Sequence, residues 1–178
     1  MLSDVRVLDL SDERGALCGQ LLADLGADVI RIEPPGGSPM RTALPNELMW
    51  QVYARNCDSL VLDLASSDGK RRFADAARDA DLVIDNDQLR NFGIDVAALR
   101  ASNPSLVHLS ITAFGDGPKR DYQATDLIAQ AASGAMAITG YHVGKPLRTG
   151  AITAWSHAGV AGAGAALLAL RSAAETGV

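Results

Sequence analysis

The stretch RTGAITAWSHAG, from Arg148 to Gly159, precedes a run of small apolar residues that is typical of a helix. In an open α/β enzyme, a polar turn at a strand end commonly carries the reacting group. The middle of this stretch is Trp155, whose indole offers only an N–H donor and no nucleophilic lone pair. The stretch is therefore either a catalytic turn without its nucleophile or an ordinary core segment.

A second candidate is the polar turn at residues 11–14, with the sequence SDER, at the start of an expected helix. A dinucleotide site needs the spacing GxGxxG, so that the backbone can approach a pyrophosphate. Gly15 and Gly19 do not have that spacing, which argues against NAD. Two interpretations stay open for the turn: helix capping with solvation, or contact with a ligand.

The histidines and cysteines give no catalytic or metal pattern. His142 lies in a loop and His157 opens the last expected helix, and neither shares a spacing with a nucleophile or a metal partner. His108 lies inside an apolar strand, where we expect a hydrogen-bonded core residue. Cys18 and Cys57 have no metal-ligand spacing. No metal site is expected.

Composition indicates one cytoplasmic globular domain. The 178 residues are 48% hydrophobic and 21% charged, and the net charge of −5 argues against nucleic-acid binding. The N-terminus has no apolar signal region, and the longest apolar run, residues 158–170, is too short to span a bilayer. Two cysteines without a disulfide framework fit reduced thiols in the cytosol.

Apolar runs alternate with helical periodicity along the chain. Strands are expected at 5–10, 28–33, 59–64, 81–85 and 105–112, and helices at 15–26, 66–80, 95–103, 126–136 and 156–176. This alternation predicts an α/β fold, an open and mostly parallel Rossmann-like sheet with helices on both faces. Ligands bind beyond the carboxyl ends of such strands, so the Pro/Gly-rich loops 34–47 and 114–123 are candidate site loops.

Five sequence blocks carry a family resemblance. They are VRVLDLSDERGALCGQLLADLGADVIRIEPPGG, SLVLDLASSDGKRRFADAARDADLVIDN, LRASNPSLVHLSITAFGDGP, TDLIAQAASGAMAITG and LRTGAITAWSHAGVAGAGAALLAL. In this order they resemble the N-terminal part of the class III CoA-transferases, the formyl-CoA transferase and CaiB/BaiF family. The resemblance implies a single N-terminal-like domain over residues 1–178, without the family's C-terminal part.

The resemblance also locates the chemistry. The family uses an aspartate to attack an acyl-CoA thioester, forming a mixed anhydride and then an enzyme–CoA thioester. That aspartate belongs to the block RxGxxxxDxxxG. Aligned on Arg148, Gly150 and Gly159, the block places Trp155 at the position of the aspartate. The resemblance therefore implies a catalytic turn whose nucleophile is absent, and no catalytic residue is assigned.

Other carboxylates do not restore the nucleophile in the sequence. Glu175 lies a helix away and Asp126 belongs to a different block, so neither is expected to act as a local substitute. Related racemases use a histidine before an aspartate, and here the pair is Thr125–Asp126, which lacks the base.

The family's CoA-contact positions are altered too. The block NxxKRS corresponds to ARNCDS, where Cys57 and Asp58 replace two cations, and ENFRPG corresponds to a shorter segment that keeps Asn86 but continues with Asp87. Such changes weaken the attraction for a polyanion. The residues expected to contact CoA are Arg14, Arg31, Asn86 and Asp87, while Arg41, Lys119 and Arg148 are either further phosphate contacts or solvated side chains.

Three functions stay open at this point. The chain is a noncatalytic CoA-transferase-like domain, an active acyl-CoA transferase subunit completed by a partner chain, or a regulatory module that binds CoA or a nucleotide. CoA is the expected ligand or substrate, and no covalently bound cofactor is expected. Family members form intertwined dimers, which implies an exposed apolar surface and either a homo-oligomer or an intact CoA-transferase as partner.

Overall fold

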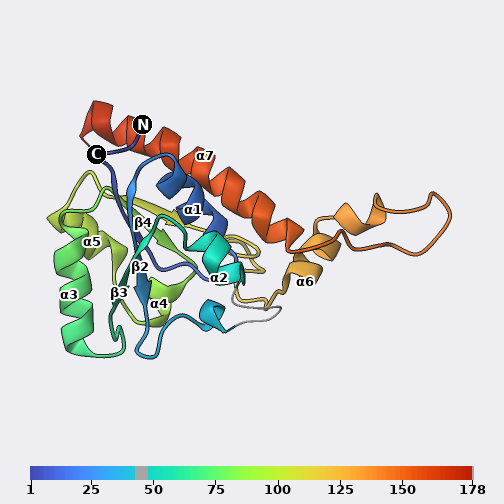
Figure 1. Cartoon of the computed structure of the whole chain (residues 1–178), viewed down its shortest axis with the longest axis horizontal. Helices are drawn as coiled ribbons and strands as arrows, with labels where there is room; N and C mark the ends of the chain where they lie inside the picture. The colour runs from blue at the N-terminus through green and yellow to red at the C-terminus, as the bar shows by residue number, and fades with distance from the viewer. Residues whose placement is uncertain (43–47, 178) are drawn as a thin grey trace.

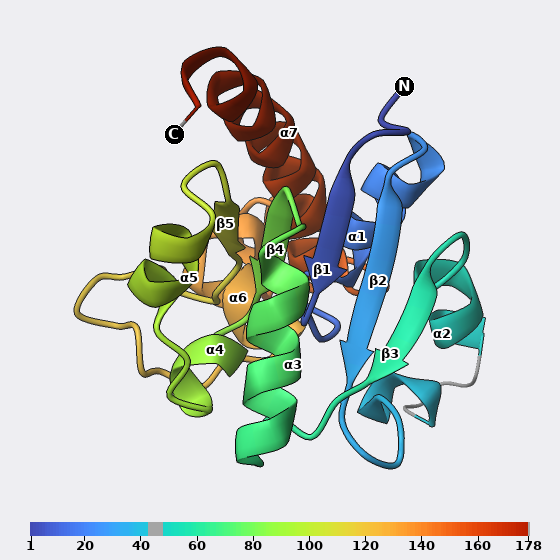
Figure 2. The same ribbon diagram turned by 90° about the vertical axis from the view of Figure 1, so that its left-hand side faces the viewer.

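The structure is a computed structural model that describes residues 1–42 and 48–177. Its sheet, seen within the whole chain in Figure 1, has five strands, and all four neighbouring pairs are parallel. The strand order is β3-β2-β1-β4-β5 (Figure 2). The strands are β1 (Arg6–Asp9), β2 (Asp28–Glu33), β3 (Asp58–Val61), β4 (Leu82–Asp85) and β5 (Val107–Ser110). The expected α/β class and parallel sheet are confirmed.

Helices cover both faces of the sheet (Figure 2). They are α1 (Ala16–Asp24), α2 (Leu48–Tyr53), α3 (Ser67–Ala77), α4 (Gln88–Asn91), α5 (Val96–Ser102), α6 (Asp126–Ala132) and α7 (Thr153–Thr176), with the 3-10 turns η1 (Pro39–Arg41) and η2 (Ala135–Ala137). Helices α1 and α7 lie on one face, and α3 and α5 on the other. Within the described ranges, no helix is long and apolar enough to cross a membrane.

The elements differ from the sequence expectation in detail. The helix expected at 126–136 stops at Ala132, because Gly134 adopts a left-handed conformation (φ 81°) and η2 follows it. The short helices α2 and α4 were not expected. Of the expected loop 34–47, residues 39–41 form η1, and residues 43–47 lie outside the described part of the chain.

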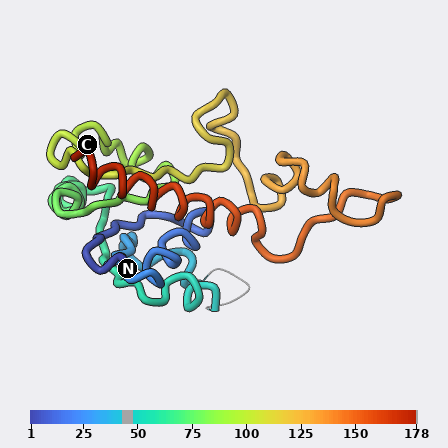
Figure 3. The backbone as a smooth tube through the Cα atoms, turned by 90° about the horizontal axis from the view of Figure 1, so that it is seen from above, coloured from blue at the N-terminus to red at the C-terminus, as the bar shows by residue number. Residues whose placement is uncertain are grey.

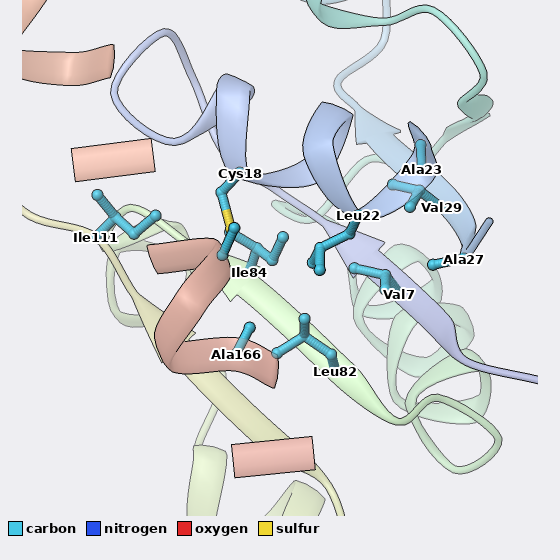
Figure 4. Close-up of a cluster of buried hydrophobic side chains, with 11 residues drawn as sticks. Val7, Cys18, Leu22, Ala23, Ala27, Val29, Leu82, Ile84, Ile111 and Ala166 are labelled. Carbon is cyan, nitrogen blue, oxygen red and sulfur yellow. The ribbon is translucent and has the colours of Figure 1, made fainter. Parts of the chain in front are cut away.

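Two apolar clusters hold the layers together. Successive residues of a strand point to opposite faces, so Val7 packs under α1 and α7 while Leu8 packs under α3. In the first cluster, Cys18 and Leu22 of α1 meet the sheet and α7 (Figure 4). A Cβ at Gly159 would lie 2.8 Å from the Cβ of Leu17, so only a glycine permits α7 to approach α1 this closely.

An arm extends away from these layers between α6 and α7 (Figures 1 and 3). The arm comprises residues 133–152 and includes η2. Three of its apolar side chains are almost fully exposed: Ile138 at 90%, Tyr141 at 86% and Val143 at 77%. Exposed apolar side chains gathered on a projecting segment are typical of an interaction surface.

Candidate functional site

Asn86 joins three loops at the carboxyl edge of the sheet. It follows β4 and is almost fully buried. Its Oδ1 accepts a 2.8 Å hydrogen bond from the backbone N–H of Asp12, in the turn after β1. Its Nδ2 donates to the carbonyl of Ile111, just after β5. Asn86 therefore fixes the positions of the turns where a ligand of an open α/β sheet is expected.

A polar pocket of about 470 Å³ opens beside Asn86. We call it the arginine pocket; its lining residues are Asp12, Glu13, Arg14, Asn86, Asp87, Arg90, Asn91, Arg120, Asp121, Tyr122, Gln123 and Ala124. The structure thus brings together three of the four residues expected to contact CoA. It also places Arg90 and Arg120 at the pocket, two residues without a family motif in the sequence, although Arg120 belongs to the candidate site loop 114–123.

Each arginine of the pocket has a carboxylate partner. Arg14 makes a 2.6 Å ion pair with Asp12, and this hydrogen-bonded contact raises the pKa of the Arg14 guanidinium. It also donates to the carbonyl of Asn86, at 3.4 Å. The pocket is therefore lined by cations whose charges are already compensated.

The other two arginine pairs tie the β5–α6 loop to α4. Arg90 pairs with Asp121 at 3.3 Å, and Arg120 pairs with Asp87 at 2.8 Å. Arg120 also pairs with Asp116, and its buried Nε has no hydrogen-bond partner in the described structure.

Arg31 lies apart from the arginine pocket. Its side chain is only 3% exposed, and it contacts Asp9 at 3.6 Å across β1 and β2. It donates to the carbonyls of Tyr53 at 2.9 Å and Ser11 at 3.3 Å. The guanidinium of Arg31 therefore joins α2 to the sheet, and only a rearrangement of these contacts would turn it toward a ligand.

A second cavity, of about 350 Å³, continues from the arginine pocket at Asp12 and Glu13, which line both. We call it the apolar slot, because its walls are mainly Leu10, Ile32, Pro34, Pro35, Pro39, Met40, Leu62, Leu64 and Phe92. Ser11 also lines it, with a buried Oγ that has no hydrogen-bond partner among the described residues. An apolar slot with a few polar groups is suited to a planar ring that carries hydrogen-bonding atoms.

Glu33 fixes one edge of the apolar slot. It accepts two 2.7 Å hydrogen bonds from Arg41, one from Ser59 and one from the backbone N–H of Ser38. These contacts, that with Arg41 foremost, lower the pKa of Glu33 to about 2. Arg41 also stacks on the ring of Trp50, 4.1 Å from its centroid. The guanidinium of Arg41 is therefore already bound by Glu33 and Trp50 and is not a free cation for a phosphate.

Trp155 lies in the first turn of α7 and is 5% exposed. Its backbone N–H donates to Oδ1 of Asp126 at 3.1 Å, and Oδ2 of Asp126 accepts from Gln130 at 2.5 Å. Asp126 belongs to a different sequence block from Trp155, yet α6 brings its carboxylate to the Trp155 turn. Both oxygens of this buried carboxylate already have donors, so it is held as a structural acceptor.

The histidine and cysteine side chains of the described residues form no cluster with one another. The expectation of a hydrogen-bonded His108 was wrong for Nε2, which lies 3.5 Å from Asp85 Oδ2 without making a hydrogen bond. Burial raises the pKa of the Cys18 thiol to about 12 and that of Cys57 to about 11, so both are protonated at neutral pH. In residues 1–42 and 48–177, no three His, Cys, Asp or Glu side chains gather as metal ligands.

Comparison with known proteins gives one family. Residues 2–178 match CoA-transferase family III. The chain is 38% identical to the succinyl-CoA–D-citramalate CoA-transferase of Chloroflexus aurantiacus, over 99% of this chain and 46% of that protein. It is 36% identical to the succinate–glutarate CoA-transferase of Agrobacterium fabrum, over 99% of this chain and 48% of that protein.

A solved structure agrees with these matches. The crystal structure of a CaiB/BaiF family protein from Brucella suis superimposes with a TM-score of 0.90 at 32% identity, covering 97% of this chain and 50% of that one. The chain spans about half the length of the curated relatives it matches. On fold and sequence together, this chain belongs to CoA-transferase family III.

Proposed function

We propose that this chain holds CoA or an acyl-CoA at the carboxyl edge of its sheet and does not transfer CoA by itself. The observation that carries the proposal is Trp155, a buried indole at the position where the family resemblance places the attacking aspartate. The relatives are named for CoA transfer between carboxylic acids, so CoA is the ligand that the site should keep even where the reaction is lost.

The two cavities match the two ends of the CoA nucleotide. The apolar slot suits the adenine ring, with the free Oγ of Ser11 as a hydrogen-bonding group. The adjoining arginine pocket offers Arg14, Arg90 and Arg120 to phosphate oxygens. Asn86 fixes the backbone of the turns after β1 and β5 through its hydrogen bonds with Asp12 and Ile111. We therefore assign CoA contact to the arginine pocket, with Arg31 as a structural support of the turn.

Neither Asp126 nor the two cysteines is poised to replace the missing nucleophile. The carboxylate of Asp126 is buried and is held by hydrogen bonds from Trp155 and Gln130, so it would have to leave these donors to turn toward a thioester. The thiols of Cys18 and Cys57 are protonated because burial raises their pKa. Without an attacking group the mixed anhydride does not form, and loss of a covalent nucleophile typically lowers the rate by several orders of magnitude.

Association with a second chain belongs to the same proposal. The exposed apolar side chains of the arm support a homo-oligomer or a complex with an intact CoA-transferase. If such a partner supplies the missing carboxylate, the chain acts as a subunit of an active enzyme, which is the alternative that the arm favours.

Two measurements test this function. Titration calorimetry with CoA should show one site, and incubation with succinyl-CoA, hydroxylamine trapping and intact-mass analysis should show no acyl or CoA adduct on the chain. Trp155→Asp alone should not restore transfer, because the altered CoA-contact positions remain. A covalent adduct on the unmodified chain would show that another residue has taken over the attack.

A further inference from the structure

The arginine pocket neutralises its own cations. Arg14 pairs with Asp12, Arg90 pairs with Asp121, and Arg120 pairs with Asp87 as well as with Asp116. Three of these aspartates, Asp12, Asp87 and Asp121, line the pocket themselves. With Glu13, four negative charges face three positive ones, which leaves a formal charge of −1. A phosphate entering the pocket therefore competes with built-in carboxylates for each guanidinium.

Of the two aspartates that pair with Arg90 and Arg120 inside the pocket, Asp87 is better placed to compete than Asp121. Its side chain is 19% exposed and that of Arg120 is 30% exposed, whereas the Arg90–Asp121 pair is largely in solvent. Solvent and salt screen a partly buried pair less than an exposed one. Removing Asp87 should therefore change the field in the pocket more than removing Asp121.

Nothing in α4 requires the charge of Asp87. The residue occupies the N-cap position of α4, yet its side chain makes no capping hydrogen bond. Its backbone has φ 66°, a left-handed conformation that asparagine adopts as readily as aspartate. In the described structure, Arg120 is the partner of its carboxylate.

We propose that Asp87 is an internal competitor for phosphate, a specificity-determining residue that lowers the affinity of the arginine pocket for polyanionic ligands. This inference rests on the proposed function, in which the pocket receives the phosphates of CoA. Binding requires that Arg120 exchanges the oxygen of Asp87 for a phosphate oxygen. The competition grows with ligand charge, so Asp87 disfavours CoA more than dephospho-CoA, which lacks one phosphate, and leaves uncharged pantetheine unaffected.

The test compares Asp87→Asn with the unmodified chain by titration calorimetry with CoA, dephospho-CoA and pantetheine. We expect Asp87→Asn to bind CoA about 3- to 10-fold more tightly at low salt, with a smaller gain for dephospho-CoA and none for pantetheine. The gain should shrink in about 0.5 M salt because the interaction is screened. Asp121→Asn, which releases the exposed Arg90, should give a smaller gain of the same kind.

The matched control is Asp75→Asn on α3, which removes the exposed partner of Arg78, 3.2 Å away, at the same change in net charge. Equal CoA affinity for Asp87→Asn, Asp75→Asn and the unmodified chain would overturn the inference and leave CoA binding intact. An equal gain for pantetheine would also overturn it. Absence of CoA binding in every chain, each shown to be folded by circular dichroism, would reject the proposed function together with the inference.

Discussion

The carboxylate of Asp126 caps helix α7 through the 3.1 Å hydrogen bond from the backbone N–H of Trp155, a residue 29 positions later in the chain. The first N–H groups of a helix have no partner within it. The N-cap residue of α7 is Ile152, which has no side chain able to accept a hydrogen bond. Asp126 supplies that acceptor from α6, and its negative charge lies at the positive end of the α7 dipole.

Removing this remote cap should destabilise the fold. Asp126→Ala leaves the buried N–H of Trp155 and the Nε2 of Gln130 without their acceptor, so we expect a loss of about 2–4 kcal/mol in the free energy of unfolding. Asp126→Asn keeps Oδ1 for Trp155 and loses only the contact with Gln130, so its loss should be about half as large. Urea unfolding measures both. Equal losses for the two variants would contradict a capping role for the carboxylate.

Replacing a glycine of α7 by alanine should lower the stability of the fold at one position and raise it at another. A Cβ at Gly159 would lie 2.8 Å from Leu17, so Gly159→Ala should push α7 from α1 and destabilise the fold by about 1–3 kcal/mol. A Cβ at Gly164 meets open space, so Gly164→Ala should stabilise it by about 0.5–1 kcal/mol through helix propensity. The melting temperatures of the two variants distinguish the effect of the steric contact with Leu17 from the effect of helix propensity. Similar effects of both substitutions would exclude tight α1–α7 packing at Gly159.

Glu33 should make stability depend on acidic pH. Its pKa is lowered from 4.5 to about 2 by Arg41, Ser59 and Ser38 in the folded state. The charged form is therefore favoured by folding, so its contribution is complete above pH 4.5 and is lost as the pH falls toward 2. Urea unfolding of Glu33→Gln against the unmodified chain should show a stability difference that narrows across this range. Glu175→Gln, which removes an exposed partner of Arg171, serves as the control and should give no such narrowing.

Much of the scaffold could be predicted from local pattern. The apolar runs located all five strands, and Ser66 begins α3 with its Oγ accepting from the N–H of Gly69, as expected for an N-cap. Helix α2 escaped prediction because its six residues, LMWQVY, are apolar or aromatic except Gln51, so no alternation of apolar and polar residues marks a helix face. Helix α4 is too short, at four residues, for any period to be visible.

The site was less accessible to sequence reasoning. The sequence pointed to Trp155, Asn86 and Asp87 because they occupy positions of recognisable family blocks. Arg120 belongs to no such block, and its contact with Asp87 spans 33 residues, which only the tertiary fold defines. The role of Asp126 was missed because its contact with Trp155 spans 29 residues and is also defined only by the tertiary fold.

The arm should mediate association. Ile138 and Tyr141 are almost fully exposed on it, and burying such side chains against a second chain is favourable by about 1.5–3 kcal/mol for each one fully buried. Light scattering across a concentration series should therefore show an oligomer for the unmodified chain. The double substitution of Ile138 and Tyr141 by serine should shift the curve toward monomer. Leu168→Ser, at an exposed position on α7 away from the arm, is the control. A monomer at every concentration, or loss of association only in Leu168→Ser, would remove the arm as the interface.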